Sequence, residues 1–309
     1  MKIGIIDLDT SHPSSWIPVE RELGHEIVGV YDGGSIHPKG FAENFAREHN
    51  IPKVYDTPTA MVNDVDCVII HGCDWDTHVE KARPFVEAGK AVLIDKPFAG
   101  NRVDLETIRK WATERPNGAR VAGGSSLLLC NEVCAYRARP EEERGIPHTV
   151  FAGCGVDEFN YGIHAYALLS GLMGGGIRSV RHLGKRAQRT IEVNWHDGRV
   201  GYLLIGKQPK WLPFHATAVS DRNVTQLSPV PGDLYRAFLE ALLPYLAGET
   251  DIPPVDPEIL FEPELAALAA LQSWENGDCE VALSDISPAT RYDGAVFAAS
   301  YRAARYGTP

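Results

Sequence analysis

The sequence DCVIIHGCDWDTHVEKARPFVEAGKAVLIDKP, residues 66–97, contains the pattern that decides the fold. A short apolar run, CVII, leads into a helix-like segment that stops at Gly89, and a second apolar run, AVLI, follows. Apolar runs of this length on either side of one helix are typical of neighbouring parallel strands that are buried on both faces. The stretch therefore predicts a strand–helix–strand unit.

The same alternation of strands and helices extends over residues 1–122, which predicts a doubly wound parallel sheet with helices on both faces. From about residue 148 the strand candidates become longer and more polar, and Asp197-Gly198 marks a hairpin between two of them. We predict an α/β protein with a Rossmann-type dinucleotide-binding domain over 1–122. A second α+β domain with an open, mostly antiparallel sheet follows over 123–309, and its C-terminal tail packs back on the body or on a partner subunit.

Composition excludes several classes of partner. The net charge of -11 argues against nucleic acid and against anionic membranes. The apolar runs are far shorter than the ~20 residues that a membrane span needs, and the N-terminus shows no leader pattern. The six cysteines form no C-x-x-C pair, which indicates structural thiols in a reducing compartment. We expect a cytoplasmic protein.

The turn after the first strand, DLDTSH at residues 7–12, lacks the glycines that let a diphosphate approach a helix N-terminus. Asp7, Asp9 and His12 stand in their places, whereas Thr10 and Ser11 can still offer hydrogen-bond donors. Asp7, Asp9 and His12 either form a hydrogen-bonded cap or chelate a divalent ion, and we expect the cap and no metal.

An acidic residue, Asp32, ends the second strand, where NAD-binding proteins contact the adenosine ribose. The alternative is a turn residue before Gly33-Gly34. No arginine follows closely, so we expect NAD rather than NADP, with altered phosphate contacts.

The central block, together with NYGIHAYALL at 160–169, resembles the Gfo/Idh/MocA family of sugar and cyclitol oxidoreductases. His78, the EAGK sequence at 87–90 and Asp95-Lys96-Pro97 carry the resemblance, with aspartate where the family has glutamate. The resemblance implies a dinucleotide-binding domain joined to an open-sheet domain. It also implies hydride transfer between a sugar-like substrate and a nicotinamide.

The resemblance assigns Lys96 and His164 as the residues that handle the proton of the reacting oxygen. Asn160 and His164 match the family's D-x-x-x-H pattern and would share one helix face. The alternatives are an ion-paired Lys96 and a structural His164. The full set of implied cofactor contacts is Asp9, Thr10, Ser11, His12, Asp32, His71, Asp95, Lys96 and Pro97, and the implied substrate pocket is Trp75, His78, Lys96, Asn160 and His164.

The sequence therefore favours an NAD-dependent oxidoreductase that acts on a sugar, cyclitol or sugar-derived acid, as a homodimer or homotetramer paired through the open sheet. The alternative is a family member without redox turnover: a sugar-binding or regulatory protein, or a cofactor-free isomerase or lyase. That alternative rests on the missing glycines and on Asn160 and Ala167, which stand where the family often has acids.

Overall fold

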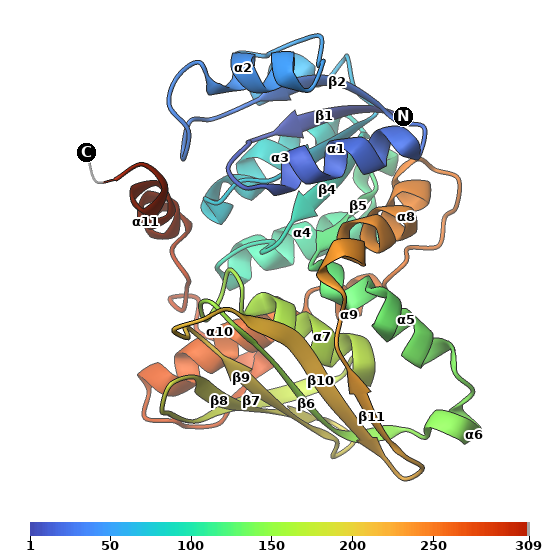
Figure 1. The fold of residues 1–309 in the computed structure, drawn as a ribbon, viewed down its shortest axis with the longest axis vertical. Helices are drawn as coiled ribbons and strands as arrows, with labels where there is room; N and C mark the ends of the chain where they lie inside the picture. Colours follow the sequence, from blue (N-terminus) through green and yellow to red (C-terminus); the bar gives the residue numbers. More distant parts are fainter. Residues whose placement is uncertain (308–309) are drawn as a thin grey trace.

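The computed structural model describes residues 1–307, and its first domain is built on a five-stranded parallel sheet (Figure 1). The strands are β1 (Lys2–Ile6), β2 (Glu26–Tyr31), β3 (Cys67–Ile70), β4 (Ala91–Asp95) and β5 (Val121–Gly124), in the order β2-β1-β3-β4-β5. Every residue of β3, β4 and β5 is buried, which explains why these strands read as uninterrupted apolar runs. The predicted Rossmann-type domain is confirmed, and its sheet ends just past the expected boundary at residue 122.

Helices join these strands in the predicted places. They are α1 (His12–Glu22), α2 (Phe41–Glu48), α3 (His78–Glu87) and α4 (Arg102–Glu114). Two short elements differ from the prediction. Segment 53–57 forms only one bridge, between Val54 and Val30, and the segment after it is a 3₁₀ turn, Pro58–Met61, rather than an α-helix.

The second domain is an open seven-stranded sheet, as predicted. Its strands are β6 (Pro147–Gly155), β7 (Ile177–Lys185), β8 (Arg189–Trp195), β9 (Val200–Ile205), β10 (Leu212–Ser220), β11 (Val224–Leu227) and β12 (Val281–Ala282), in the order β11-β10-β6-β9-β8-β7-β12. Only β6 and β9 pair in parallel, and the other neighbours are antiparallel. The β8–β9 hairpin turns at Asp197-Gly198, as the sequence indicates.

One face of this sheet is covered by helices. The helices of the second domain are α5 (Asn131–Ala138), α6 (Glu141–Arg144), α7 (Ile163–Met173), α8 (Leu234–Leu246), α9 (Pro257–Leu260) and α10 (Glu262–Glu275). Helix α7 packs on β6, β9 and β10 beneath α10, and all of its residues are buried. The opposite face is open, and Phe151, Leu183 and Leu204 are exposed there.

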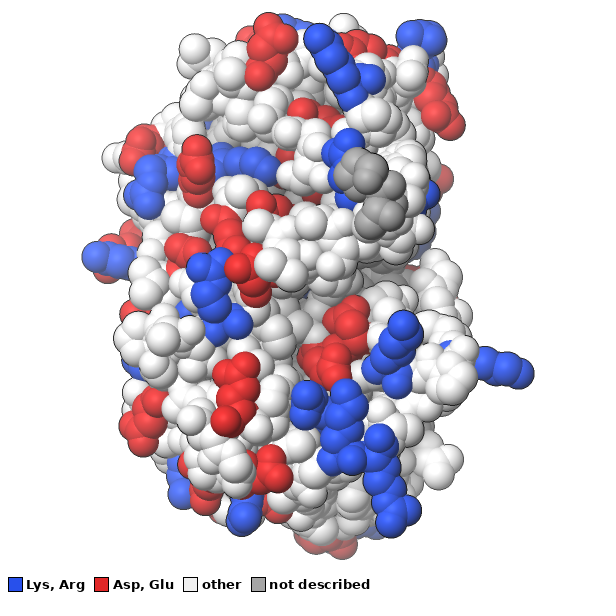
Figure 2. Space-filling view, turned by 90° about the vertical axis from the view of Figure 1, so that its left-hand side faces the viewer, with Lys and Arg blue, Asp and Glu red and all other residues white. Residues whose placement is uncertain are grey.

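Two late helices return to the first domain. Helix α8 packs on α1 and on the ends of β4 and β5. Helix α11 (Gly294–Tyr306) lies beside the carboxyl edge of the first sheet, where Ala298 buries Ile36 and Cys73 (Figure 1). Figure 2 shows this side of the molecule, where acidic and basic side chains are interspersed. The segment that ends the described structure thus contacts the first domain.

The cysteines and the helix lengths complete this description. All six thiols are free, and Cys134 and Cys279 are exposed while the other four are buried. Among residues 1–307, no helix combines the length and apolar character needed to cross a bilayer.

Candidate functional site

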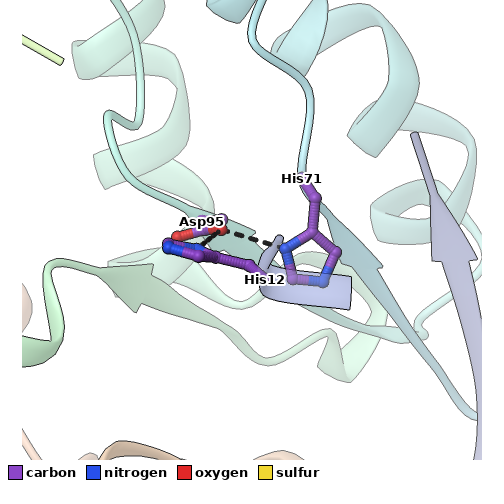
Figure 3. Close-up of side chains that lie close together, drawn as sticks. All are labelled: His12, His71 and Asp95. Atoms are coloured by element: carbon purple, nitrogen blue, oxygen red, sulfur yellow. Dashed lines mark hydrogen bonds and ion pairs between the residues drawn. The ribbon is translucent and has the colours of Figure 1, made fainter. Parts of the chain in front are cut away.

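Two histidines and an aspartate meet where β1, β3 and β4 end. His12 begins α1, His71 follows β3, and Asp95 is the last residue of β4. Asp95 Oδ2 accepts a hydrogen bond from His12 Nδ1 at 2.5 Å and from His71 Nδ1 at 2.9 Å (Figure 3). Carboxyl ends of parallel strands are where doubly wound sheets bind their ligands, so this cluster occupies the expected edge.

The hydrogen-bond partners of Asp95 keep its carboxyl group ionised. Burial alone would raise the pKa of Asp95, but the contacts with His12 and His71 outweigh it and lower that pKa well below its usual value. The other carboxylate oxygen, Oδ1, accepts the backbone N–H of Lys96 at 2.7 Å. Burial lowers the pKa of His71, so this imidazole is neutral, and its Nε2 has no partner in the described structure.

Aromatic rings enclose the cluster. Trp16 stacks on His12 with 5.6 Å between ring centroids and meets His71 edge-on at 4.8 Å. Tyr235, from α8 of the second domain, meets His12 edge-on at 5.0 Å. The cluster therefore lies at the junction of the two domains.

Lys96 lies next to the cluster and contacts the second domain. Its Nζ donates to the side-chain oxygen of Asn160 at 3.0 Å and to the Asn160 carbonyl at 3.1 Å. The predicted helical placement of Asn160 is wrong, because α7 begins only at Ile163. Asp157 instead accepts the N–H groups of Phe159 and Tyr161, both at 2.9 Å, and so holds this segment in a turn.

His164 is on the buried face of the junction. Its Nδ1 is 2.7 Å from the hydroxyl of Ser125, a residue that also caps the turn after β5. Burial, then the charges of Lys96 and His12, lower the pKa of His164 well below its usual value. The imidazole is therefore neutral at physiological pH and able to accept a proton.

The turn after β1 is filled by its own side chains. Asp7 adopts a left-handed conformation with φ of 64°, and its carboxylate accepts Gly33 N–H at 3.1 Å and Lys81 Nζ at 2.5 Å. Asp9 accepts Cys73 N–H at 2.7 Å, and burial together with the Asp7 charge raises the pKa of Asp9 to about 7. Both aspartates are fully buried.

The rest of the turn is partly accessible. The Thr10 hydroxyl accepts His12 N–H at 3.1 Å, and Ser11 is the exposed N-cap of α1 without a side-chain capping bond. The predicted cap by Asp7, Asp9 and His12 does not form, because these side chains bond to Gly33, Cys73 and Asp95. Only Thr10 contributes a hydrogen bond to the start of α1.

The loop after β2 closes over the same edge. Asp32 accepts Gly34 N–H at 3.2 Å, as a turn residue does. His37 donates to the carbonyl of Leu8 at 2.9 Å and contacts the Tyr306 hydroxyl at 2.7 Å. Arg302 donates to the Gly34 carbonyl at 3.0 Å. Helix α11 and the loop after β2 therefore cover the turn after β1.

These residues do not fit a dinucleotide in the usual manner. The second glycine of the family's motif lets the diphosphate approach the backbone. Here that position holds Asp9, whose carboxyl group reaches across to Cys73. The third glycine position holds His12, whose ring fills the space beside Asp95. Tyr301 of α11 packs against the buried cluster of Ile36, Cys73 and Ala298.

Two predicted pocket residues are structural. His78 is fully buried between the carbonyl oxygens of Phe98 and Gly72, each 3.0 Å from a ring nitrogen. Trp75 is also buried, and its Nε1 donates to the Tyr292 carbonyl at 2.8 Å. The prediction that these side chains line the substrate pocket is therefore wrong. Pro97 is buried after a cis peptide bond with Lys96.

Sequence reasoning missed three contributors: Ser125, Tyr235 and Lys81. Each lies far along the chain from its partner, and no local pattern identifies any of them.

Comparison with known proteins supports the fold and the first domain. Residues 2–122 match the Gfo/Idh/MocA model, described as an oxidoreductase family with an NAD-binding Rossmann fold. A trans-1,2-dihydrobenzene-1,2-diol dehydrogenase from Oryctolagus cuniculus is 35% identical over 92 residues, which is 29% of this chain and 27% of that protein. A dehydrogenase of the same name from Xenopus tropicalis is 28% identical over 87 residues. The matched segments thus span about a quarter of these relatives.

Solved structures share the whole architecture. A scyllo-inositol dehydrogenase from Lactobacillus casei, with bound NAD(H) and scyllo-inositol, superposes with a TM-score of 0.77 at 15% identity, covering 92% of this chain and 99% of that one. A UDP-N-acetylglucosamine 3-dehydrogenase from Acidithiobacillus ferrooxidans gives 0.71 at 19% identity, covering 87% and 95%. At these identities the likeness establishes the two-domain fold.

Proposed function

We propose that this chain, whose residues 2–122 match the Gfo/Idh/MocA oxidoreductase family, catalyses proton transfer on the keto form of a sugar- or cyclitol-like polyol, without a resident nicotinamide. One observation carries this proposal. Lys96, which contacts Asn160, and His164, which contacts Ser125, lie close enough at the domain junction for the Lys96 charge to lower the pKa of His164, while the turn that would hold a dinucleotide is filled by Asp9 and His12.

The two groups suit the two halves of such a reaction. Lys96 uses two of its three N–H donors on Asn160, which leaves one for a substrate oxygen. On a keto substrate, this donor stabilises the negative charge that develops on the carbonyl oxygen. His164, neutral because of its low pKa, accepts the proton from the carbon beside the carbonyl.

The fate of that proton defines the product. Its return to the opposite face of the same carbon completes an epimerisation, and its delivery to the former carbonyl carbon, as the carbonyl group forms at the neighbouring carbon, completes an isomerisation. Its transfer to a leaving hydroxyl group, which departs as water, completes an elimination. Neither outcome changes the oxidation state of the substrate as a whole, so neither needs an external oxidant.

The substrate class is supported by the relatives. The comparison proteins are named for a cyclic diol, for scyllo-inositol and for a sugar nucleotide. All of these compounds carry hydroxyl groups on a ring. A lysine held between a strand end and a polar turn is suited to bind one such oxygen.

A second candidate is the family's own reaction, NAD-dependent dehydrogenation of a sugar, cyclitol or sugar-derived acid. Two observations favour it: the match of residues 2–122 to a family with an NAD-binding fold, and Asp32 at the end of β2. Against it stand the filled turn and the cover of α11.

Calorimetric titration separates the candidates. Nucleotide-stripped protein is titrated with NAD and NADP, and we expect no heat of binding at micromolar concentrations. Micromolar NAD binding that is lost in Asp32→Ala would overturn the proposal in favour of the dehydrogenase.

The proton chemistry is then measured by NMR in D₂O. A panel of keto-sugars and keto-cyclitols is screened for deuterium incorporation beside the carbonyl. We expect incorporation that is lost in Lys96→Met and His164→Gln but kept in the exposed controls Lys110→Met and His148→Gln. Exchange that survives both site variants would contradict the assigned roles.

A further inference from the structure

The His12–His71–Asp95 cluster brings three metal-ligating atoms to one point. His12 Nδ1, His71 Nδ1 and Asp95 Oδ2 lie within 4.8 Å of one another, and no other group of this kind occurs in residues 1–307. Figure 3 shows both rings directed at the same carboxylate oxygen. An aspartate that only oriented a single catalytic histidine would not need a second imidazole at that oxygen.

The surroundings support the binding of a cation. Two imidazoles and one carboxylate are a common ligand set for a divalent ion, and His71 and Asp95 are buried. The backbone N–H of Lys96 donates to the other oxygen of Asp95, Oδ1, and such a hydrogen bond fixes the orientation of a ligating carboxylate. The rings of Trp16 and Tyr235 enclose the cluster and limit its access to solvent.

The three residues also account for departures from the family pattern. His12 replaces the third glycine of the nucleotide-binding turn, and Asp95 replaces a glutamate. With the side chain of His71 they fill the same strand-end region. One site explains why these departures occur together.

We propose that His12, His71 and Asp95 bind one divalent transition-metal ion. Two histidines and a carboxylate suit Zn²⁺ and other first-row ions such as Co²⁺. Metal–ligand bonds of about 2.0–2.2 Å place tetrahedral ligand atoms roughly 3.3 Å apart. Asp95 Oδ2 lies 2.5 Å from His12 Nδ1 and 2.9 Å from His71 Nδ1, so each of these distances has to increase by less than about 1 Å.

A metal ion at this site would assist the reaction proposed above. This catalytic role rests on the proposed function, whereas the binding of the metal does not. Three protein ligands leave a position for water or for a substrate oxygen. An ion in that position polarises a carbonyl group and so assists removal of the neighbouring proton. Lys96, the residue after Asp95, would act on the same substrate.

Metal binding is tested without any substrate. Protein stripped by a chelator and dialysed is titrated with Zn²⁺ by calorimetry and with Co²⁺ by visible absorbance. We expect one ion per chain and a Co²⁺ spectrum with the intense ligand-field bands of a four- or five-coordinate site. Affinity should fall by at least about a hundredfold in His12→Ala and Asp95→Asn.

A matched control comes from elsewhere in the chain. His182 and Asp278 form a similar pair, with Nδ1 and Oδ1 2.6 Å apart, but residues 1–307 supply no third ligand to it. We expect His182→Ala to bind Zn²⁺ and Co²⁺ as the unchanged protein does. His12→Gln keeps the side-chain bulk, and circular dichroism verifies that each variant is folded.

Absence of a one-to-one site, or binding that persists in folded His12→Gln and Asp95→Asn, would overturn the proposal. Because no substrate is present, a negative result leaves the test of Lys96 and His164 unaffected. Conversely, metal binding without deuterium exchange would reject the proposed function and keep the metal site.

Discussion

Glu20 allows a quantitative prediction about stability. It lies on the buried face of α1, and neither carboxyl oxygen has a partner in the described structure. Burial raises the pKa of Glu20 from 4.5 to about 8. The folded protein therefore holds a proton there that the unfolded chain releases at much lower pH.

The sign of the effect follows from linkage. Below pH 4.5 both states are protonated and Glu20 has no pH-dependent effect. As pH rises from 4.5 toward 8, the unfolded chain ionises first and the free energy of unfolding falls. At about 1.36 kcal/mol per pH unit, the loss reaches roughly 5 kcal/mol above pH 8, as an order of magnitude.

The variant Glu20→Gln removes this loss, because its amide does not ionise. We expect urea unfolding to give similar stabilities for the variant and the unchanged protein at pH 5. The variant should then be more stable by about 3–4 kcal/mol at pH 8. Glu26→Gln, on an exposed edge of β2, is the matched control and should follow the unchanged protein at every pH. If the stability of Glu20→Gln also follows the unchanged protein across pH 5–8, the buried, protonated Glu20 is refuted.

Three further predictions concern packing and assembly. In Gly72→Ala the new Cβ would meet Asp7 Oδ2 at 2.7 Å, so we expect the free energy of unfolding, measured with urea, to fall by about 1–3 kcal/mol. The control Gly232→Ala has open space around its Cβ, and its free energy of unfolding should be nearly unchanged. Truncation after Asp293 removes the cover on Cys73, and the rate of its labelling by a thiol reagent should rise at least about tenfold; an unchanged rate would mean that α11 does not protect this thiol. We propose that two or four chains pair through the open sheet face. Leu204→Glu on this face should then lower the mass measured by light scattering, while Val103→Glu on α4 should not. A monomeric unchanged protein would contradict this proposal.

The fold was largely predictable because its signals are local. Parallel strands buried on both faces give uninterrupted apolar runs, as in CVII and AVLI, and Asp197-Gly198 specifies its hairpin. The errors have equally local causes. The segment around Val54 is flanked by prolines and lies at the edge of the sheet, so only one bridge forms. Strand β11 is short and polar, and the sequence analysis did not identify it.

The site was less predictable because it depends on contacts between distant residues. His12 and Asp95 are 83 residues apart, and nothing near either residue indicates that their side chains meet. The missing glycines suggested a changed phosphate contact. The structure instead shows that the replacement side chains turn inward, toward Cys73 and Asp95. Only the resemblance placed Asn160 in one predicted pocket with Lys96, whereas the contact between them depends on a turn that Asp157 holds.

Helix α11 has a consequence for folding during synthesis. Gly294 donates to Asp76 across 218 residues of chain, so the last helix of the described structure completes the surface of the first domain. Domains generally fold as the ribosome releases them, N-terminal first. This first domain emerges with Ile36 and Cys73 uncovered, and it keeps them uncovered while the whole second domain is translated. A nascent chain stalled before α11 is therefore a natural target for chaperones that bind exposed apolar surface, and docking of α11 ends that exposure.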